Sequence, residues 1–333
     1  HWERDKTLAL NLRRYAAWAE RKIDKMGRIT RALSRDGSAM AMAISATDIV
    51  TRIEQVHQTS AVVTAAAGRL AAAASMMGVL LKAEKDTLTL RLDGGGPAGV
   101  LLAVADSQGN VKVSVTNPIV ELPLNKMGKL DVGGAVGRDG TLSIIREMGL
   151  KEPYIGQVPI VSGEIAEDIT SYYATSEQTP TVCGLGVLVN PDLSVQAAGG
   201  FLVQLLPFAD NAVIDRLEEN LKDLPPVSSM IRDGMTPQDI VMKLLDGLEP
   251  DILDEYLPVY RCGCSRERTE DMLRSLGEKE LDEIIREDHG AEVCCHFCEK
   301  KYQFTESELI ALRDSIRQEN EQQDINEADG GQE

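Results

Sequence analysis

Two cysteine motifs, CGC at residues 262–264 and CHFC at residues 295–298, stand thirty residues apart and decide how this end of the chain folds. They contribute four of the six cysteines, namely Cys262, Cys264, Cys295 and Cys298. Four thiolates in two closely spaced pairs complete a tetrahedral Zn²⁺ site and leave no position for a substrate. The spacing therefore predicts a structural or regulatory zinc site, not a catalytic one.

The same spacing has a redox consequence. Cysteines one or two residues apart can close short disulfides, so the four sulfurs can hold zinc when reduced or form two local bridges when oxidised. Oxidation would then expel the metal. In small metal domains zinc binding is worth roughly 10–16 kcal/mol and is in effect the folding free energy, because so short a segment builds little core. We expect the segment to unfold when zinc is lost.

Two neighbouring residues leave the ligand set open. Cys294 adds a fifth thiol beside Cys295, and His296 adds an imidazole, so metal ligation or disulfide pairing can shift register. We favour Cys295 because it preserves the two-residue loop before Cys298. Cys183 lies in an apolar stretch and is interpreted as a small core residue.

Composition restricts the classes of function. The 333 residues include 53 acidic and 35 basic side chains, a formal net charge of -18, which opposes binding to nucleic acid or anionic lipid. Clustered cysteines without an expected secretory leader indicate a reducing compartment, and the simplest interpretation is the cytoplasm. The apolar stretch 61–81 is mostly alanine with Arg69 inside it, which predicts a buried helix and not a membrane span.

The chain is long enough to predict more than one structural unit. Changes in composition divide it into an N-terminal extension at 1–25, an α+β core domain at 26–207, a helical acidic linker at 208–258, a C-terminal zinc domain at 259–312 and an acidic tail at 313–333. We expect the tail to be disordered. The predicted fold class is α+β, with antiparallel sheets and packed helices in the core domain.

Local patterns in the core domain support this class. Alternation of apolar residues predicts strands at 40–44, 87–92, 100–105, 111–115, 182–189 and 194–206, whereas helical spacing predicts two helices within 46–82 and one within 163–176. Gly133, Gly134 and Gly137 are expected to bound short strands. The result is a set of antiparallel hairpins with a few helices.

Two stretches of the core domain suggest other chemistry. The triple glycine in residues 93–99 resembles a phosphate loop, but a strand follows it instead of a helix, so we expect the glycines to supply positive φ angles at a tight bend. Glu164, Glu167 and Asp168 could be a general acid–base group. With no histidine or cysteine nucleophile nearby, they are interpreted as the acidic first turn of a helix.

The linker at 208–258 has twelve acidic and four basic residues, and prolines divide it into short helices. It is either a set of solvated helices or a metastable segment that stays folded only while docked on its neighbours. In the zinc domain, residues 269–286 are predicted to form one amphipathic helix between the cysteine pairs. The basic residues flanking the cysteines are expected to lower the thiolate pKa values: Arg261, Arg266, Arg268, Lys300 and Lys301.

The order and spacing of these motifs resemble a known family, the redox-regulated holdase chaperones of bacteria called the thirty-three-kilodalton heat-shock protein family. The resemblance runs from about Met26 to about Arg313. Beyond the four cysteines, it rests on residues 93–99, 116–118, 148–154, 161–168, 176–180 and 204–207.

The resemblance implies an ATP-independent holdase that oxidation activates. In the reduced form, Zn²⁺ on the four cysteines would keep the linker docked. On oxidation the disulfides Cys262–Cys264 and Cys295–Cys298 would form and zinc would leave. The linker would then unfold, and apolar surface would become available to unfolded clients. The activated form would be a homodimer, with no catalytic residue. One rival interpretation is a thiol–disulfide oxidoreductase that uses the CHFC motif, and another is a zinc-dependent nucleic-acid binder, which the acidic charge opposes.

Overall fold

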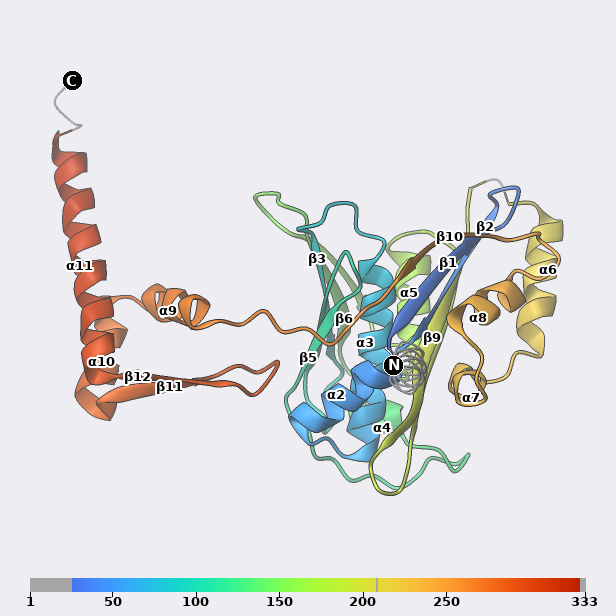
Figure 1. Cartoon of the computed structure of the whole chain (residues 1–333), viewed down its shortest axis with the longest axis horizontal. Coiled ribbons are helices and arrows are strands. Elements are labelled where there is room, and N and C mark those ends of the chain that lie inside the picture. The colour runs from blue at the N-terminus through green and yellow to red at the C-terminus, as the bar shows by residue number, and fades with distance from the viewer. Residues whose placement is uncertain (1–25, 208, 330–333) are drawn as a thin grey trace, which may run out of the picture. The chain divides into compact units, whose positions relative to one another are not determined.

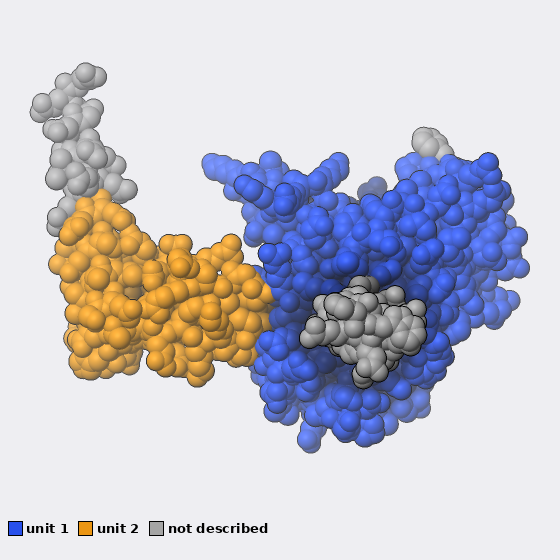
Figure 2. All heavy atoms as spheres, viewed as in Figure 1, with its two compact units in different colours: residues 1–261 blue, residues 262–333 orange. Residues whose placement is uncertain are grey.

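The computed structural model describes residues 26–207 and 209–329, and side chains as far as residue 320. The predicted extension at 1–25 lies outside the described residues. The chain forms two compact units, the first ending at Arg261 and the second beginning at Cys262 (Figure 2). Each unit has its own hydrophobic core, and each is described separately below.

Two five-stranded antiparallel sheets form the frame of the first unit (Figure 1). Sheet A has the order β10 (Asp251–Tyr256), β1 (Arg28–Leu33), β2 (Ala39–Ser45), β9 (Val195–Leu205) and β8 (Thr181–Val189). Sheet B has the order β5 (Val111–Val115), β4 (Leu101–Asp106), β3 (Thr87–Asp93), β6 (Thr141–Glu147) and β7 (Tyr154–Pro159). The predicted strands and the predicted α+β class with antiparallel sheets are confirmed.

Two helices, α2 (Thr47–His57) and α3 (Ala61–Gly78), follow β2, as the sequence predicts. Helix α3 packs against strands of both sheets, and its alanines allow the close approach that this requires. At Gly68 a Cβ atom would lie only 2.7 Å from a methyl group of Val50 on α2. By length and composition α3 could cross a membrane, but 89% of it is buried inside the fold, which confirms the prediction of a buried helix.

Two short helices cover the remaining edges of the core. Helix α5 (Ala166–Thr175) agrees with the prediction, whereas Gly133 and Gly134 do not bound a strand but lie inside α4 (Val132–Val136). The Asp131 side chain caps α4 by accepting a hydrogen bond from the Gly134 amide. The cap favours one helical turn over the strand expected from the glycines.

The second face of sheet A is covered by the segment that follows β9. This segment folds into α6 (Asn211–Lys222), α7 (Val227–Arg232) and α8 (Pro237–Leu244), as expected for residues 208–258. Figure 1 shows these helices on the side of the sheet away from α3. Their apolar sides and the small residues of the sheet form a separate core cluster.

The rest of the segment does not continue as helix. Residues 251–256 form β10, which pairs antiparallel with β1, although no strand is predicted there from the sequence. Residues 259–261 are assigned to the zinc domain by composition, but they lie on the edge of β5 within the first unit. The Val111 amide donates to the Val259 carbonyl, and the Arg261 amide donates to the Val111 carbonyl. Free backbone groups on the edge strands β1 and β5 explain both differences.

The second unit contains α9 (Arg266–Ser275), α10 (Glu278–Asp288), the hairpin of β11 (Gly290–Cys294) and β12 (Lys301–Thr305), and α11 (Glu306–Asp329). The single helix predicted for 269–286 is wrong, because Gly277, with φ 87°, separates α9 from α10. Helix α11 continues to Asp329, where a disordered tail was expected; its many Glu, Gln and Arg residues favour helix.

Candidate metal centre

Secondary structure presents each cysteine pair in a fixed turn. Cys262 and Cys264 lie just before α9, whose N-terminus is capped by the Ser265 side chain, accepting from the Arg268 amide. Cys295 and Cys298 lie in the turn between β11 and β12, where the amides of Cys298 and Glu299 both donate to the Cys295 carbonyl. A cap and a hairpin turn thus hold the four thiols on two rigid supports.

The four Sγ atoms gather in one place. Those of Cys262, Cys264, Cys295 and Cys298 all lie within 4.8 Å of one another. The Cys262–Cys295 sulfurs are 3.6 Å apart and the Cys264–Cys298 sulfurs 3.3 Å apart. Sulfurs bound tetrahedrally to Zn²⁺ at about 2.3 Å would be about 3.8 Å apart, so the arrangement fits a four-coordinate zinc site. A metal ion can therefore bind here.

The thiols respond differently to their surroundings. Burial raises the pKa of Cys264, but hydrogen bonds from Tyr302 and then from the neighbouring thiols outweigh it and lower the pKa to about 7. Burial raises the pKa of Cys262 and of Cys298. Without a bound cation the four thiols therefore cannot all ionise near neutral pH, and a divalent ion supplies the positive charge that four thiolates require.

Three of the flanking basic residues have partners of their own. Arg266 pairs with Glu270 and Glu308 and stacks on the Phe304 ring, and Lys301 pairs with Glu292. Arg268 donates to the Gly263 carbonyl at 2.9 Å, which fixes the backbone between the first two cysteines. Carboxylates and backbone thus engage these three cations, and the groups that lower the pKa of Cys264 are Tyr302 and the neighbouring thiols, through hydrogen bonds.

The two alternative ligands lie outside the cluster. Among the described residues, the group of thiols close enough to share one ion contains neither Cys294 nor His296. Cys294 ends β11, its thiol donates to Glu299, and its pKa is raised by burial and then by that carboxylate. Cys183 packs against the main core of the first unit, and burial raises its pKa, as suits a core residue.

Sequence reasoning missed one residue of the centre. Tyr302 on β12 is buried, and its hydroxyl donates a hydrogen bond of 3.2 Å to the Cys264 sulfur. Lys300 lies 4.8 Å from the centre of the same ring. The position of Tyr302 four residues after the CHFC motif is the only sequence signal that could have drawn attention to it.

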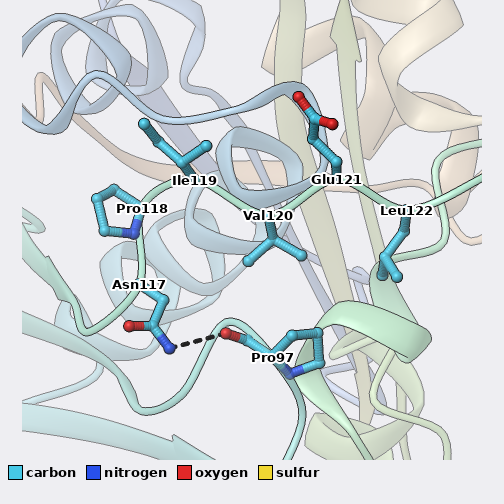
Figure 3. A pocket seen from close by; sticks show the side chains of 7 residues that line it. All are labelled: Pro97, Asn117, Pro118, Ile119, Val120, Glu121 and Leu122. Atoms are coloured by element: carbon cyan, nitrogen blue, oxygen red, sulfur yellow. Dashed lines mark hydrogen bonds between the residues drawn. The ribbon is translucent and has the colours of Figure 1, made fainter.

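The glycine-rich stretch 93–99 has a structural role. A Cβ atom on Gly96 would lie 2.5 Å from the Ala135 carbonyl of α4, so the glycine permits close backbone packing, while Gly95 and Gly99 take the positive φ angles expected. The stretch borders a surface pocket of about 490 Å³, where the Asn117 amide donates to the Pro97 carbonyl (Figure 3). Its one charged lining residue is Glu121, which does not suit phosphate.

The acidic residues at the start of α5 are also structural. Asp168 is buried, and its carboxylate accepts hydrogen bonds from the amides of Val161, Ser162 and Ile165. Glu164 pairs with Arg69 of α3. The carboxylates are thus committed to backbone amides and an arginine, which supports the interpretation as a helix start.

The position of the CHFC motif does not support the oxidoreductase interpretation. A thioredoxin-like enzyme places its C-x-x-C at the start of a helix that follows a strand. Here the motif is the turn of a two-stranded hairpin, and its cysteines face two further thiols.

Comparison with known proteins agrees with this geometry. The family model described as Hsp33 protein matches residues 27–305. The "33 kDa chaperonin" of Clostridium botulinum (strain Alaska E43 / Type E3) is 44% identical over 291 residues, which are 87% of this chain and 99% of that protein. That of Bacillus velezensis is 45% identical over 289 residues, 87% of this chain and 99% of the relative.

A solved structure is similar as well. The crystal structure of the 33 kDa chaperonin (heat shock protein 33 homolog) from Thermotoga maritima has 35% sequence identity and a TM-score of 0.80, and the match covers 87% of this chain and 98% of that one. The match to the family model, the relatives and the shared fold together show that this chain belongs to the Hsp33 family.

Proposed function

We propose that this chain is a redox-regulated, ATP-independent holdase that binds unfolded proteins under oxidative stress. The observation that carries the proposal is the second face of sheet A. Buried residues of the sheet on that face, including Ala41, Ala43 and Phe201, pack against the helices of the linker. A segment with twelve acidic and four basic residues covers this apolar face, so undocking of the segment would present the face to unfolded protein.

The sensor in this proposal is the group Cys262, Cys264, Cys295 and Cys298. In the reduced protein these thiolates hold Zn²⁺, which cross-links the segment before α9 to the β11–β12 hairpin. The donor set and the sulfur separations support this choice of metal. The core of the second unit is small, with six buried residues, so its folding depends on the cross-link: Leu273, Leu281, Ile285, Tyr302, Phe304 and Leu309.

Oxidation removes the ligands. The Cys262 and Cys264 thiolates form one disulfide and the Cys295 and Cys298 thiolates form the other. The spacing permits both bridges, and the family resemblance implies these pairs. Formation of each bridge takes two electrons from a pair of thiolates; one peroxide accepts them together with two protons from solvent and is reduced to two molecules of water. The sulfurs can then no longer bind the metal, and the second unit unfolds.

Unfolding of the second unit releases the linker at 208–258. The charge of the segment opposes its own compaction, and two prolines at its centre interrupt its helices. The linker therefore depends on its docking surface. We propose that undocked linker and uncovered sheet together bind clients, that the active form is a homodimer, and that the protein works in the cytoplasm. The net charge of -18 supports a protein that binds neither nucleic acid nor membranes.

The test measures zinc release and client aggregation together. Reduced full-length protein is compared with protein treated with hydrogen peroxide under mild heating, using a chromogenic chelator for zinc and light scattering for a thermally unfolding client. Zinc release that accompanies suppression of aggregation is expected. Cys264→Ser should abolish zinc binding, whereas the matched control Cys294→Ser should retain it. Retention of zinc after oxidation, or no suppression of aggregation, would contradict the proposal.

A further inference from the structure

Strand β10 closes an edge of sheet A. It lies beside β1 at the end of the sheet (Figure 1), with Thr30 opposite Glu255 and Arg31 opposite Asp254. β10 belongs to the acidic linker, while β1 belongs to the core domain, and more than 220 residues separate them in sequence. When β10 is docked, the backbone groups of β1 are paired on both sides.

The side chains of the two strands are complementary in charge. Arg31 forms an ion pair with Asp254, Arg28 lies 3.7 Å from Glu255, and the Thr30 hydroxyl donates to Glu255 at 3.2 Å. Just beyond the strands, Arg35 pairs with Glu249. A basic strand thus holds an acidic one.

The apolar contribution of β10 comes mainly from Tyr256 at its end, which packs against the main core. Ile252 and Leu253 are 37% and 49% exposed, and Leu257 just after the strand is 54% exposed. The ion pairs are partly exposed to solvent, and such pairs contribute little to stability. Strand β10 is therefore among the weakly held parts of the sheet and depends on the folding of the segments on either side of it.

The chain after β10 ties this strand to the metal centre. Residues 259–261 pair with the edge of β5, and the Tyr260 hydroxyl donates to the Val113 carbonyl at 3.2 Å. The next residue is Cys262, a member of the thiol cluster. The segment 251–261 is therefore anchored between α8 and the second unit. Unfolding of the second unit would release its C-terminal end, and undocking of α8 would release its N-terminal end.

We propose that β1 is a client-binding strand. Once β10 leaves, its free edge takes an extended segment of unfolded protein as an added antiparallel strand, and Arg28 and Arg31 favour segments that combine acidic and apolar residues, as β10 does. Unpaired edge strands bind extended chains in this way, with backbone hydrogen bonds giving affinity and side chains giving preference. The inference rests on the proposed function, because release of β10 requires undocking of the linker.

A peptide probe tests the backbone part of the inference. A labelled peptide with the sequence DILDEY, copied from β10, should bind the oxidised full-length protein in fluorescence anisotropy and should not bind the reduced protein. In an antiparallel pair only alternate residues direct their amides to the neighbouring strand. N-methylation of one alternate set of amides should therefore weaken binding roughly tenfold or more, while methylation of the other set should have little effect. Equal effects of both sets would overturn the inference.

A charge swap tests the preference. In oxidised protein the double variant Arg28→Glu, Arg31→Glu should bind the acidic peptide roughly tenfold more weakly and should prefer the peptide KILKKY, in which lysines replace the acidic residues. Arg52→Glu, a matched change of an exposed arginine on α2, should keep the preference of the unchanged protein. Unchanged preference in the double variant would overturn the inference.

Two results distinguish this inference from the proposed function. If oxidised protein does not suppress client aggregation, the proposed function itself fails. If it suppresses aggregation but the peptides do not bind β1, only the inference fails. The inference would also be overturned if β10 of a second copy occupies β1. Cross-linking of β10 to β1 between the two copies of an oxidised dimer that excludes the peptide would show this.

Discussion

The hydroxyl of Tyr302 lies 3.2 Å from the sulfur of Cys264 and donates a hydrogen bond to it. The tyrosine belongs to β12, and the cysteine lies before α9, so the bond joins the two supports of the thiol cluster. A donated hydrogen bond stabilises a thiolate more than a thiol. Tyr302 therefore favours the thiolate of Cys264, which is the form that binds a metal and the form that reacts with oxidants and alkylating agents.

Replacement of this tyrosine should change the pH dependence of thiol reactivity. While the second unit is still folded directly after the metal is removed, hydrogen bonds from Tyr302 and the neighbouring thiols outweigh burial and hold the pKa of Cys264 at about 7. Tyr302→Phe removes the donor and should raise the pKa toward the usual value of about 8.5, so that alkylation at pH 7 slows several-fold. Pulse labelling with iodoacetamide directly after chelation, across a pH series and followed by mass spectrometry of the Cys264 peptide, measures this before the unit unfolds. An unshifted profile would show that the hydroxyl does not stabilise the thiolate.

Metal removal should unfold the second unit and release the linker, but leave the core domain folded. The second unit has a core of six buried residues, whereas the first has an extended core that spans both sheets. A zinc chelator added to reduced protein should therefore make the linker and residues 262–305 sensitive to protease and leave the core domain at 26–207 resistant. Mass mapping of the fragments over time tests this. Protection of the second unit without metal would mean that its core suffices for folding.

Weakened docking of the linker should activate the protein without oxidant. Ile240 on α8 is fully buried against sheet A, whereas Met242 on the same helix is 40% exposed. Ile240→Ala should cost about 2–5 kcal/mol of packing and shift the linker toward its undocked state. The reduced variant is expected to suppress client aggregation, with its zinc retained.

Met242→Ala is the control for this experiment, because it shortens an exposed side chain of the same helix and should leave the reduced protein inactive. Light scattering and zinc content are measured on both reduced variants. Equal inactivity of the two would show that undocking of α8 is not the activating step.

The buried Asp168 should be important for stability, not for chemistry. Its carboxylate accepts from the backbone amides of four residues that precede α5, at 161–163 and 165. Asp168→Ala leaves those amides without a partner and should lower the free energy of unfolding by roughly 3 kcal/mol. Glu167→Ala, at the exposed neighbouring position, should change stability little. Thermal unfolding followed by circular dichroism compares the two variants.

Some features follow from short-range patterns in the sequence. The period-two alternation in Thr87–Asp93 and the alanine-rich run of α3 appear in the structure as a strand and a buried helix. The four cysteines were recognisable because metal ligation requires particular side chains at short spacing. In each case residues that are close in sequence determine the structure or the ligand set.

Other features depend on residues far apart in sequence. The DILDEY segment has no clear apolar alternation, and it becomes β10 because β1 offers unpaired backbone groups to it. The contact of Tyr302 with Cys264 likewise depends on how the β11–β12 hairpin folds against the start of α9. The sequence by itself pointed to the four candidate thiols and to most of the local elements. Only the tertiary structure decided which strand closes sheet A and which hydroxyl reaches the thiol cluster, because pairing and packing between distant segments leave no local pattern.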